Sequence, residues 1–225
     1  VKEYTKKHEF IPDRKLELLH NGIDTKKFKK GKRNLRKELG FSMDDIVVGV
    51  VGRVDVRKGH KVLIDAIAEI NDQKVKLAII GTGPLEADLK KYVKDKNISE
   101  RVVFAGFRED IVEAFNTLDL FCLPSKTEGL PLVVVEAMSC ELPVIVTDID
   151  SHRAIISDGK DGLLFPVNSA KALRKHLLAL ITSSDLRRKL KKNARKKALT
   201  EYDFSKNLAD IEGLYKIIYT GESLE

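Results

Sequence analysis

The sequence contains no tryptophan, only two cysteines, and no run of the roughly 20 apolar residues that a membrane-spanning helix needs. Cys122 and Cys140 each lie in or beside an apolar segment, so we expect two buried, reduced thiols and a cytoplasmic location. Residues 1–10 are mostly polar or charged and do not resemble a secretory signal. The sequence also lacks a visible cluster of metal-ligating side chains, so we expect no metal site.

What the chain has in excess is positive charge. Its formal net charge is +7, and eight of the eleven residues in Arg187–Lys197 are Lys or Arg. Leu186, Leu190, Ala194 and Ala198 recur among them at every fourth position, which predicts an amphipathic helix with a basic outer face. That face is either simply solvated or rests on an anionic membrane. Nucleic acid is a third interpretation, disfavoured because no aromatic side chain interleaves the charges as a stacking platform.

The N-terminal part of the chain does not fit a single pattern. A second basic stretch, Lys26–Lys37, is interpreted as a surface connection into a short helix at Asn34–Leu39. Upstream, Lys15–Asp24 resembles one strand that ends in an Asn-Gly turn and has no partner helix. We therefore expect residues 1–30 to be the trailing edge of another domain plus a linker, and residues 31–225 to form one domain.

From Ile46 onward, short apolar strands alternate with segments of helical periodicity. The expected strands are Ile46–Val51, Val75–Ile80, Val102–Ala105, Leu120–Leu123 and Pro143–Thr147. The expected helices are Lys58–Ile70, Leu85–Val93, Ile111–Leu118, Leu132–Ser139, Ala170–Ile181, Asp185–Leu199 and Phe204–Tyr219, with no strong strand after Asp148. This alternation predicts an α/β fold: a Rossmann-like doubly wound parallel sheet with helices on both faces and extra C-terminal helices.

Ligands of such a sheet bind beyond the carboxyl ends of its strands. The first strand is followed by Gly52, Arg53 and Lys58, and the second by a turn with Gly81 and Gly83. Two cations beside glycine turns suit a phosphate or diphosphate, because Arg offers a planar fork and Lys a point charge. The Gly-Thr-Gly turn alone is a weak signal, since it lacks the third glycine and the ribose-binding acid of a dinucleotide fingerprint.

Two carboxylates follow the fourth strand: Glu128 in the loop and Glu136 in the helix that Pro131 would start. Both would repel a phosphate, so sugar and ribose hydroxyls are better ligands for them. Alternatively, Glu136 only braces the helix and Glu128 is ordinary loop charge. Backbone N–H groups at the start of this helix are expected to be free to bind phosphate oxygens. They belong to Leu130, Leu132 and Val133.

In order and spacing, these segments resemble the C-terminal domain of retaining glycosyltransferases of the GT-B fold, the family 4 kind. The family patterns GR-x4-KG and G-x-GP correspond to Gly52–Gly59 and Gly81–Pro84. PS-x2-EG and EAM correspond to Pro124–Gly129 and Glu136–Met138, which places Glu128 and Glu136 at the family's E-x7-E spacing. His20–Phe28 is similar to the PNGVD…F linker between the two domains of these enzymes.

The resemblance implies roles for the matching residues. Arg53 and Lys58 would hold the diphosphate of a UDP- or GDP-linked sugar and stabilise it as the leaving group. Glu136 would bind the ribose hydroxyls, and Glu128 the transferred sugar near its reacting end. The reaction would retain the anomeric configuration, and neither a metal nor another cofactor would be required.

Other implied contacts involve main chain. The base would lie near Phe107 and Arg108, and Gly129 with the N–H groups that follow it would contact phosphate and sugar. This segment departs from the family pattern, since EGLPL stands here in place of EGFGLP. Ala154 also replaces a common glutamate, and we interpret the nearby His152 as an ordinary polar loop residue.

A complete member of this family has an N-terminal domain of comparable size that binds the acceptor and closes over the donor. Only its trailing edge would be present here, in Val1–Leu19. Because transfer needs both substrates in near-attack geometry, we expect this chain to bind a nucleotide-sugar but to transfer it poorly or not at all. A sugar or lipid-linked acceptor would bind through the missing half, with peripheral contact at the inner membrane face. The last helix would normally pack partly on that missing domain.

Two other functions stay open at this point. A related GT-B enzyme, such as a sugar-nucleotide epimerase or a phosphorylase, needs acid-base groups or a cofactor lysine in patterns that are not evident here. A non-catalytic basic module that binds nucleotide or membrane would instead show an affinity that falls steeply with salt and survives loss of Glu136.

Overall fold

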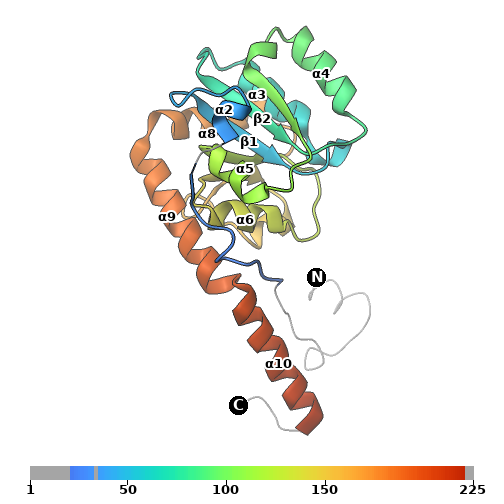
Figure 1. Cartoon of the computed structure of the whole chain (residues 1–225), viewed down its shortest axis with the longest axis vertical. Coiled ribbons are helices and arrows are strands. Elements are labelled where there is room, and N and C mark those ends of the chain that lie inside the picture. Colours follow the sequence, from blue (N-terminus) through green and yellow to red (C-terminus); the bar gives the residue numbers. More distant parts are fainter. Residues whose placement is uncertain (1–20, 33–34, 221–225) are drawn as a thin grey trace.

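The computed structural model describes residues 21–32 and 35–220. Their centre is a six-stranded parallel sheet in the order β3-β2-β1-β4-β5-β6, the strand order of the Rossmann fold (Figure 1). The strands are β1 (Ile46–Val51), β2 (Val75–Ile80), β3 (Val102–Gly106), β4 (Leu120–Leu123), β5 (Val144–Thr147) and β6 (Leu163–Phe165). The switch point, where the strand order reverses, lies between β1 and β4, and ligands of this fold bind above it.

Helices cover both faces of the sheet (Figure 1). On one face, α3 (His60–Ala68) packs against α4 (Glu86–Asp95) and α8 (Ala170–Thr182). On the other, α6 (Leu132–Ser139) packs against α9 (Ser184–Glu201), near α5 (Ile111–Thr117). β1, β2, β4 and β5 are almost entirely buried, as expected for central strands covered on both faces. The predicted fold class is confirmed.

Three local predictions need correction. β6 is a strand where none was expected, because three residues that follow a glycine-containing turn give little periodic signal. His152 lies in a helical turn, α7 (Asp150–Arg153), rather than in a loop. Lys58 does not begin a helix: it ends the short 3-10 turn η2 (Val56–Lys58), and α3 starts at His60. The strand expected in Lys15–Asp24 and the trailing edge in residues 1–19 lie mainly or wholly outside the described residues.

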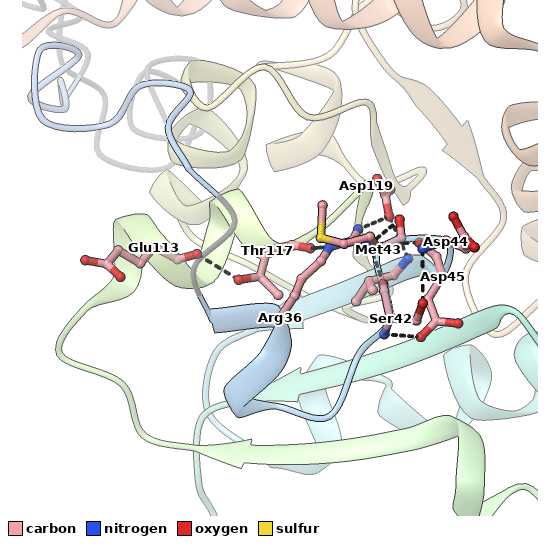
Figure 2. Close-up of polar contacts among 9 residues, drawn as sticks. Arg36, Ser42, Met43, Asp44, Asp45, Glu113, Thr117 and Asp119 are labelled. Atoms are coloured by element: carbon pink, nitrogen blue, oxygen red, sulfur yellow. Dashed lines mark hydrogen bonds and ion pairs between the residues drawn. The ribbon is translucent and has the colours of Figure 1, made fainter.

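The described lysines of the stretch Lys26–Lys37 are exposed and it leads into a short helix, as predicted for a surface connection, but Arg36 is an exception. It lies in the short helix α2 (Leu35–Glu38), with its side chain beside Asp119 (Figure 2), and is only 1% exposed. Its guanidinium pairs with Asp119 and donates to the carbonyl oxygens of Thr117, Ser42, Met43 and Asp45. Asp119 in turn accepts a hydrogen bond from the Val47 backbone N–H, over 2.8 Å. Arg36 therefore fastens the segment before β1 to the start of β4.

The last two helices run down one side of the domain, and α10 (Phe204–Thr220) projects beyond its body (Figure 1). The predicted apolar stripe of α9 is confirmed, since Leu190, Ala194 and Ala198 are completely buried. In α10, by contrast, Asn207 is the one buried residue among those described. This helix is anchored at its start, where the Phe204 N–H donates to Ile23 O over 2.9 Å.

Candidate nucleotide-sugar site

The segments that follow β1, β2 and β3 surround a cavity of about 850 Å³. The lining includes six of the residues that the sequence placed after these three strands, but not Lys58. They are Gly52, Arg53, Gly81, Gly83, Phe107 and Arg108. A cavity of this size falls in the range that holds drug-sized ligands, and it lies at the carboxyl edge of the sheet, where ligands of this fold bind.

Glycine at 81 and 83 is explained by the close approach of two backbones. A Cβ atom on Gly81, which has φ +128°, would lie 2.1 Å from Gly52 O, and one on Gly83 would lie 2.4 Å from Val54 O. The N–H of Gly81 donates to Gly106 O at 2.7 Å, and that of Gly52 donates to Ile80 O at 2.9 Å. These two N–H groups are thus engaged within the protein, and the glycines contribute space at the cavity wall rather than free donors.

Arg53 and Lys58 differ in what holds them. The Arg53 side chain is exposed at the cavity and has no hydrogen-bond or ion-pair partner within residues 21–32 and 35–220. Lys58 lies over the end of β1: its Nζ would be 3.7 Å from a Cβ atom on Gly52. Its ammonium is 2.7 Å from Glu128 Oε1. Lys58 therefore connects the cavity wall at Gly52 to the loop after β4.

Glu128 is held at one carboxylate oxygen. Oε1 accepts hydrogen bonds from Lys58 Nζ at 2.7 Å and from Ser125 Oγ at 2.6 Å. Within the described residues, Oε2 has no hydrogen-bond partner. The side chains of Lys58 and Glu128 are 18% and 13% exposed, so the pair is sheltered but still reachable by a ligand. Glu128 is therefore a fixed acceptor, with one oxygen available for hydroxyl groups.

The start of α6 only partly matches the expectation of free N–H groups. Pro131 precedes the helix, as predicted. The Leu132 N–H, however, donates to Leu130 O over 2.9 Å in a tight turn, so it is not free to bind phosphate, and that prediction is wrong. Gly129 lies in open space, with nothing within 4 Å of a Cβ placed on it, and the neighbouring Leu130 is 39% exposed. Val133, in the first turn of α6, is half-buried.

The surroundings of Glu136 and Arg108 shift the pKa values of both side chains. Burial raises the pKa of the Glu136 carboxyl, and the positive charge of Lys27 opposes this rise. Arg108 is bound by two carboxylates, Asp110 at 2.6 and 2.7 Å and Glu38 at 2.6 Å, and these hydrogen bonds raise its pKa. Arg108 is thus occupied as a cation, whereas the neighbouring Phe107 is 73% exposed at the cavity.

His152 and Ser125 are features of the site that the sequence interpretation missed. His152 is completely buried, which contradicts its interpretation as an ordinary polar loop residue. Ser125, also completely buried, belongs to the quoted PS-x2-EG pattern but was given no role, although it is a hydrogen-bond partner of Glu128. Only the pattern itself could have indicated Ser125, and no pattern in the sequence marks His152.

The family of this chain follows from its sequence as a whole. The sequence model described as "Glycosyl transferases group 1" matches residues 31–197. The chain belongs to this family. Its GT-B identity agrees with the strand order and with the solved structures that it resembles.

Relatives and solved structures of group 1 glycosyltransferases match most of this chain but only part of themselves. A UDP-Gal:alpha-D-GlcNAc-diphosphoundecaprenol alpha-1,3-galactosyltransferase of Escherichia coli is 30% identical, over 95% of this chain and 57% of its own length. HepE of Anabaena in complex with UDP-glucose has a TM-score of 0.83 at 25% identity, over 91% of this chain and 58% of that one. The chain thus spans little more than half the length of such relatives.

One solved structure has nearly the same extent as this chain. It is the C-terminal domain of the group 1 protein LpcC from Francisella tularensis, with a TM-score of 0.72 and 23% identity. The match covers 80% of this chain and 98% of that one. At this identity the likeness shows the fold alone, and it agrees with a C-terminal GT-B domain.

The described residues contain neither a cluster of metal-ligating side chains nor a membrane-spanning helix. No cluster of three or more His, Cys, Asp or Glu side chains in residues 21–32 and 35–220 has the arrangement of a metal site. Across the same part of the chain, every helix is too short or too polar to cross a membrane.

Proposed function

We propose that this chain is the donor-binding domain of a retaining glycosyltransferase that uses a UDP- or GDP-linked sugar. The observation that carries the proposal is the 850 Å³ cavity with Arg53 exposed at its wall, beside the Lys58–Glu128 pair. A free cation next to a fixed carboxylate matches a ligand that is anionic at one end and rich in hydroxyls at the other. A nucleotide-sugar has this chemistry.

The proposed ligand runs from this cavity, which takes the base, toward Lys58 and the loop after β4, which take the diphosphate and the sugar. Phe107 offers an exposed ring for the base, while Arg108, already paired with Asp110 and Glu38, stays in the wall. Arg53 and the two remaining donors of Lys58 bind the diphosphate. Gly129 and the N–H groups of Leu130 and Val133 are close enough in sequence to Glu128 to serve phosphate and sugar together.

Glu136 and Glu128 divide the hydroxyl groups between them. Glu136 binds the ribose; its partial burial makes a hydrogen-bonded ligand favourable, because a half-buried carboxylate without partners is costly. Glu128 presents Oε2 to the transferred sugar. As the bond to the diphosphate breaks, negative charge develops next to Arg53 and Lys58, and their positive charges lower the energy of that state. Retention of configuration rests on the family resemblance.

We further propose that the chain binds donor but does not transfer it efficiently. It spans 57% of the length of the Escherichia coli relative. By the family resemblance, the acceptor would bind to the remaining part. Transfer depends on holding donor and acceptor together, which contributes about 7–11 kcal/mol of a barrier in well-oriented systems. A domain that binds one of the two substrates lacks this contribution.

Titration calorimetry of the chain with UDP, GDP and ADP tests the proposal. One of these nucleotides should saturate the chain at or below millimolar concentration. Arg53→Ala should weaken binding about tenfold or more, since a charge-assisted hydrogen bond contributes about 1.5–3 kcal/mol. Glu136→Ala should weaken binding of the same nucleotide but not binding of inorganic diphosphate, because diphosphate carries no ribose.

Lys90→Ala is a suitable control, because Lys90 lies on α4 and pairs with Glu86 on the surface. It should leave the affinity unchanged. Failure of all three nucleotides to saturate would end the donor-site proposal. Saturation that Glu136→Ala leaves untouched would remove the ribose assignment only.

The basic face of α9 supports a second partner, an anionic membrane surface. The exposed cations on this helix are Arg188, Lys189, Lys192 and Lys196. Arg187 and Arg195, by contrast, point inward and donate to the carbonyl oxygens of Leu180, Phe28 and other residues, so the predicted outer face is smaller than the charge run suggests. The Escherichia coli relative acts on a diphosphoundecaprenol-linked sugar, which would bring an enzyme of this kind to a membrane.

Vesicle co-sedimentation at low salt tests this contact. Binding should require anionic phosphatidylglycerol and should fall when Lys192 and Lys196 are both changed to Glu. Lys171→Glu with Lys175→Glu, an equal charge change on the exposed face of α8, is the matched control. Equal sedimentation with neutral and anionic vesicles would refute the membrane contact.

A further inference from the structure

His152 lies at the end of a series of hydrogen bonds that leads to Glu128. The imidazole is completely buried, and Nδ1 is 2.8 Å from Thr147 O and 3.1 Å from Thr147 Oγ1. The Thr147 hydroxyl donates to Ser125 O, and the Ser125 hydroxyl donates to Glu128 Oε1. Thr147 and Ser125 are also completely buried. The series therefore joins the end of β5 to the loop after β4 without exposure to water.

The partners of His152 determine where its proton lies. A carbonyl oxygen only accepts hydrogen bonds, so Nδ1 carries the hydrogen and donates to Thr147 O. Nε2 then holds the lone pair, and it is buried with no hydrogen-bond partner in the described part of the chain. A proton there would be a second buried donor without an acceptor, and burial accordingly lowers the pKa of this imidazole. The ring is a neutral, fixed donor.

The same hydrogen bonds restrain the loop after β4, which carries Ser125 and Glu128. Thr147 ends β5, and the isolated turn of α7 presents His152 to it. On the loop side, Ser125 and Lys58 both bind Oε1 of Glu128, which leaves Oε2 as the open acceptor. The charges of Glu128 and Lys58 both influence the His152 pKa, in opposite directions, so the imidazole lies within electrostatic reach of the pair.

We infer that His152 is a positioning residue for recognition of the donor sugar. Through Thr147 and Ser125 it fixes the Glu128 carboxylate so that Oε2 faces the sugar hydroxyls. This inference rests on the proposed donor site and adds to it the element that sets sugar preference. Base, ribose and diphosphate contact other residues, so the affinity for UDP itself does not depend on His152.

The test compares affinities for donors that differ only in their sugar. Calorimetry gives the Kd values for UDP, UDP-glucose, UDP-galactose and UDP-N-acetylglucosamine. The spread is the ratio of the Kd for the weakest-binding UDP-sugar to the Kd for the tightest-binding one. His152→Leu should reduce the affinity for the preferred sugar about tenfold and bring the spread to within about twofold, while the Kd for UDP stays within about twofold. Ser125→Ala should reproduce this loss, because it removes the hydroxyl that binds Glu128.

His152→Asn is the rescue variant, since its amide keeps an N–H donor near the Nδ1 position; it should retain most of the spread. His60→Leu is the matched control. His60 is also a buried histidine, 3% exposed, but within the described residues no hydrogen bond or ion pair joins it to Glu128. It should leave the spread unchanged, even if it alters thermal stability.

The outcomes separate this inference from the proposed function. If no nucleotide binds the unsubstituted chain, the donor site itself fails, and the inference fails with it. If UDP binds and the unsubstituted chain shows no spread among the sugars, or if Ser125→Ala and His152→Leu both keep the full spread, the inference is overturned and the donor site stands. A similar loss in His60→Leu would show that general destabilisation caused the effect.

Discussion

Arg36 illustrates how a single side chain can donate hydrogen bonds to several carbonyl oxygens that have no backbone amide partner. Five oxygen acceptors from two separate segments meet its guanidinium, four carbonyl groups and the Asp119 carboxylate. By composition alone, a basic stretch predicts a solvated surface, because the local sequence does not distinguish the buried Arg36 from its exposed lysine neighbours. What distinguishes it is the set of carbonyl oxygens that the fold leaves without amide partners at the amino ends of β1 and β4.

Arg36→Ala should therefore destabilise the domain by about 3 kcal/mol or more, since it leaves Asp119 and several buried carbonyl oxygens without their donor. Urea unfolding followed by circular dichroism measures the change. Lys90→Ala, which breaks an exposed pair on α4, should cost about 0.5 kcal/mol or less. A similar small change in both variants would contradict the role assigned to Arg36.

His60 predicts a pH dependence of stability. Burial lowers its pKa from 6.5 to about 4. Between these pH values the unfolded chain binds a proton that the folded chain does not, so stability falls as the pH falls from 6.5 toward 4. The expected loss from His60 is about 3 kcal/mol, and the lowered pKa of His152 acts in the same direction.

His60→Leu should show a visibly smaller loss over this range, measured as urea unfolding at several pH values. Carboxylates with lowered pKa, such as those of Asp55 and Asp203, lose their contribution only as the pH falls through still lower values. An unchanged pH slope in His60→Leu would mean that this imidazole is not desolvated in the folded chain.

Among the elements, those that were predicted well share one property. β1, β2, β4 and α6 have the predicted bounds because they are continuous apolar runs or periodic segments whose burial dominates their conformation. β6 and α7 are only three and four residues long, and tertiary contacts set them: β6 pairs with β5, which a short sequence window does not reveal. Lys58 was misplaced for a related reason, since Gly59 adopts φ +67° and separates η2 from α3.

The turn after β2 offers a test at this scale. Gly81→Ala would place a methyl group 2.1 Å from Gly52 O at a φ of +128°, so strain and a backbone clash combine. We expect a loss of about 2 kcal/mol or more in unfolding free energy and weaker UDP binding, because Gly52 and Gly81 both line the cavity.

Gly106→Ala provides the comparison. Gly106 also has a positive φ, +68°, but a Cβ atom there would meet nothing within 4 Å. It should cost only about 1–2 kcal/mol for the left-handed backbone. Equal costs at both positions would show that the approach of the two turns is not tight.

For the whole molecule, the sequence predicted which segments meet at the cavity but not which hydrogen bonds and buried side chains hold them there. The strand order brings Gly52, Gly81 and Phe107 to one cavity, as the positions of residues after strands predict. The capture of the Leu132 N–H by Leu130 and the burial of His152 depend on three-dimensional packing, so composition and spacing carried no sign of them.

The chain spans only part of the length of its relatives. Residues 31–197 match the family model, and the part of the Escherichia coli relative that this chain matches is 57% of the relative's length. α10, which projects from the domain (Figure 1), carries exposed apolar side chains near its C-terminal end, at Tyr215, Ile218 and Tyr219. We propose, from the family resemblance, that this helix packs partly on a further domain in the complete enzyme.

The most direct test of the donor site is to map where UDP binds, using backbone amide chemical shifts of the chain during a titration. Shifts should saturate together and cluster at Gly52–Arg53, Gly81–Gly83 and Phe107–Arg108, and they should persist when salt is raised. Shifts confined to the basic face of α9, or lost with salt, would contradict a donor site at the carboxyl edge of the sheet and favour a non-specific basic module instead.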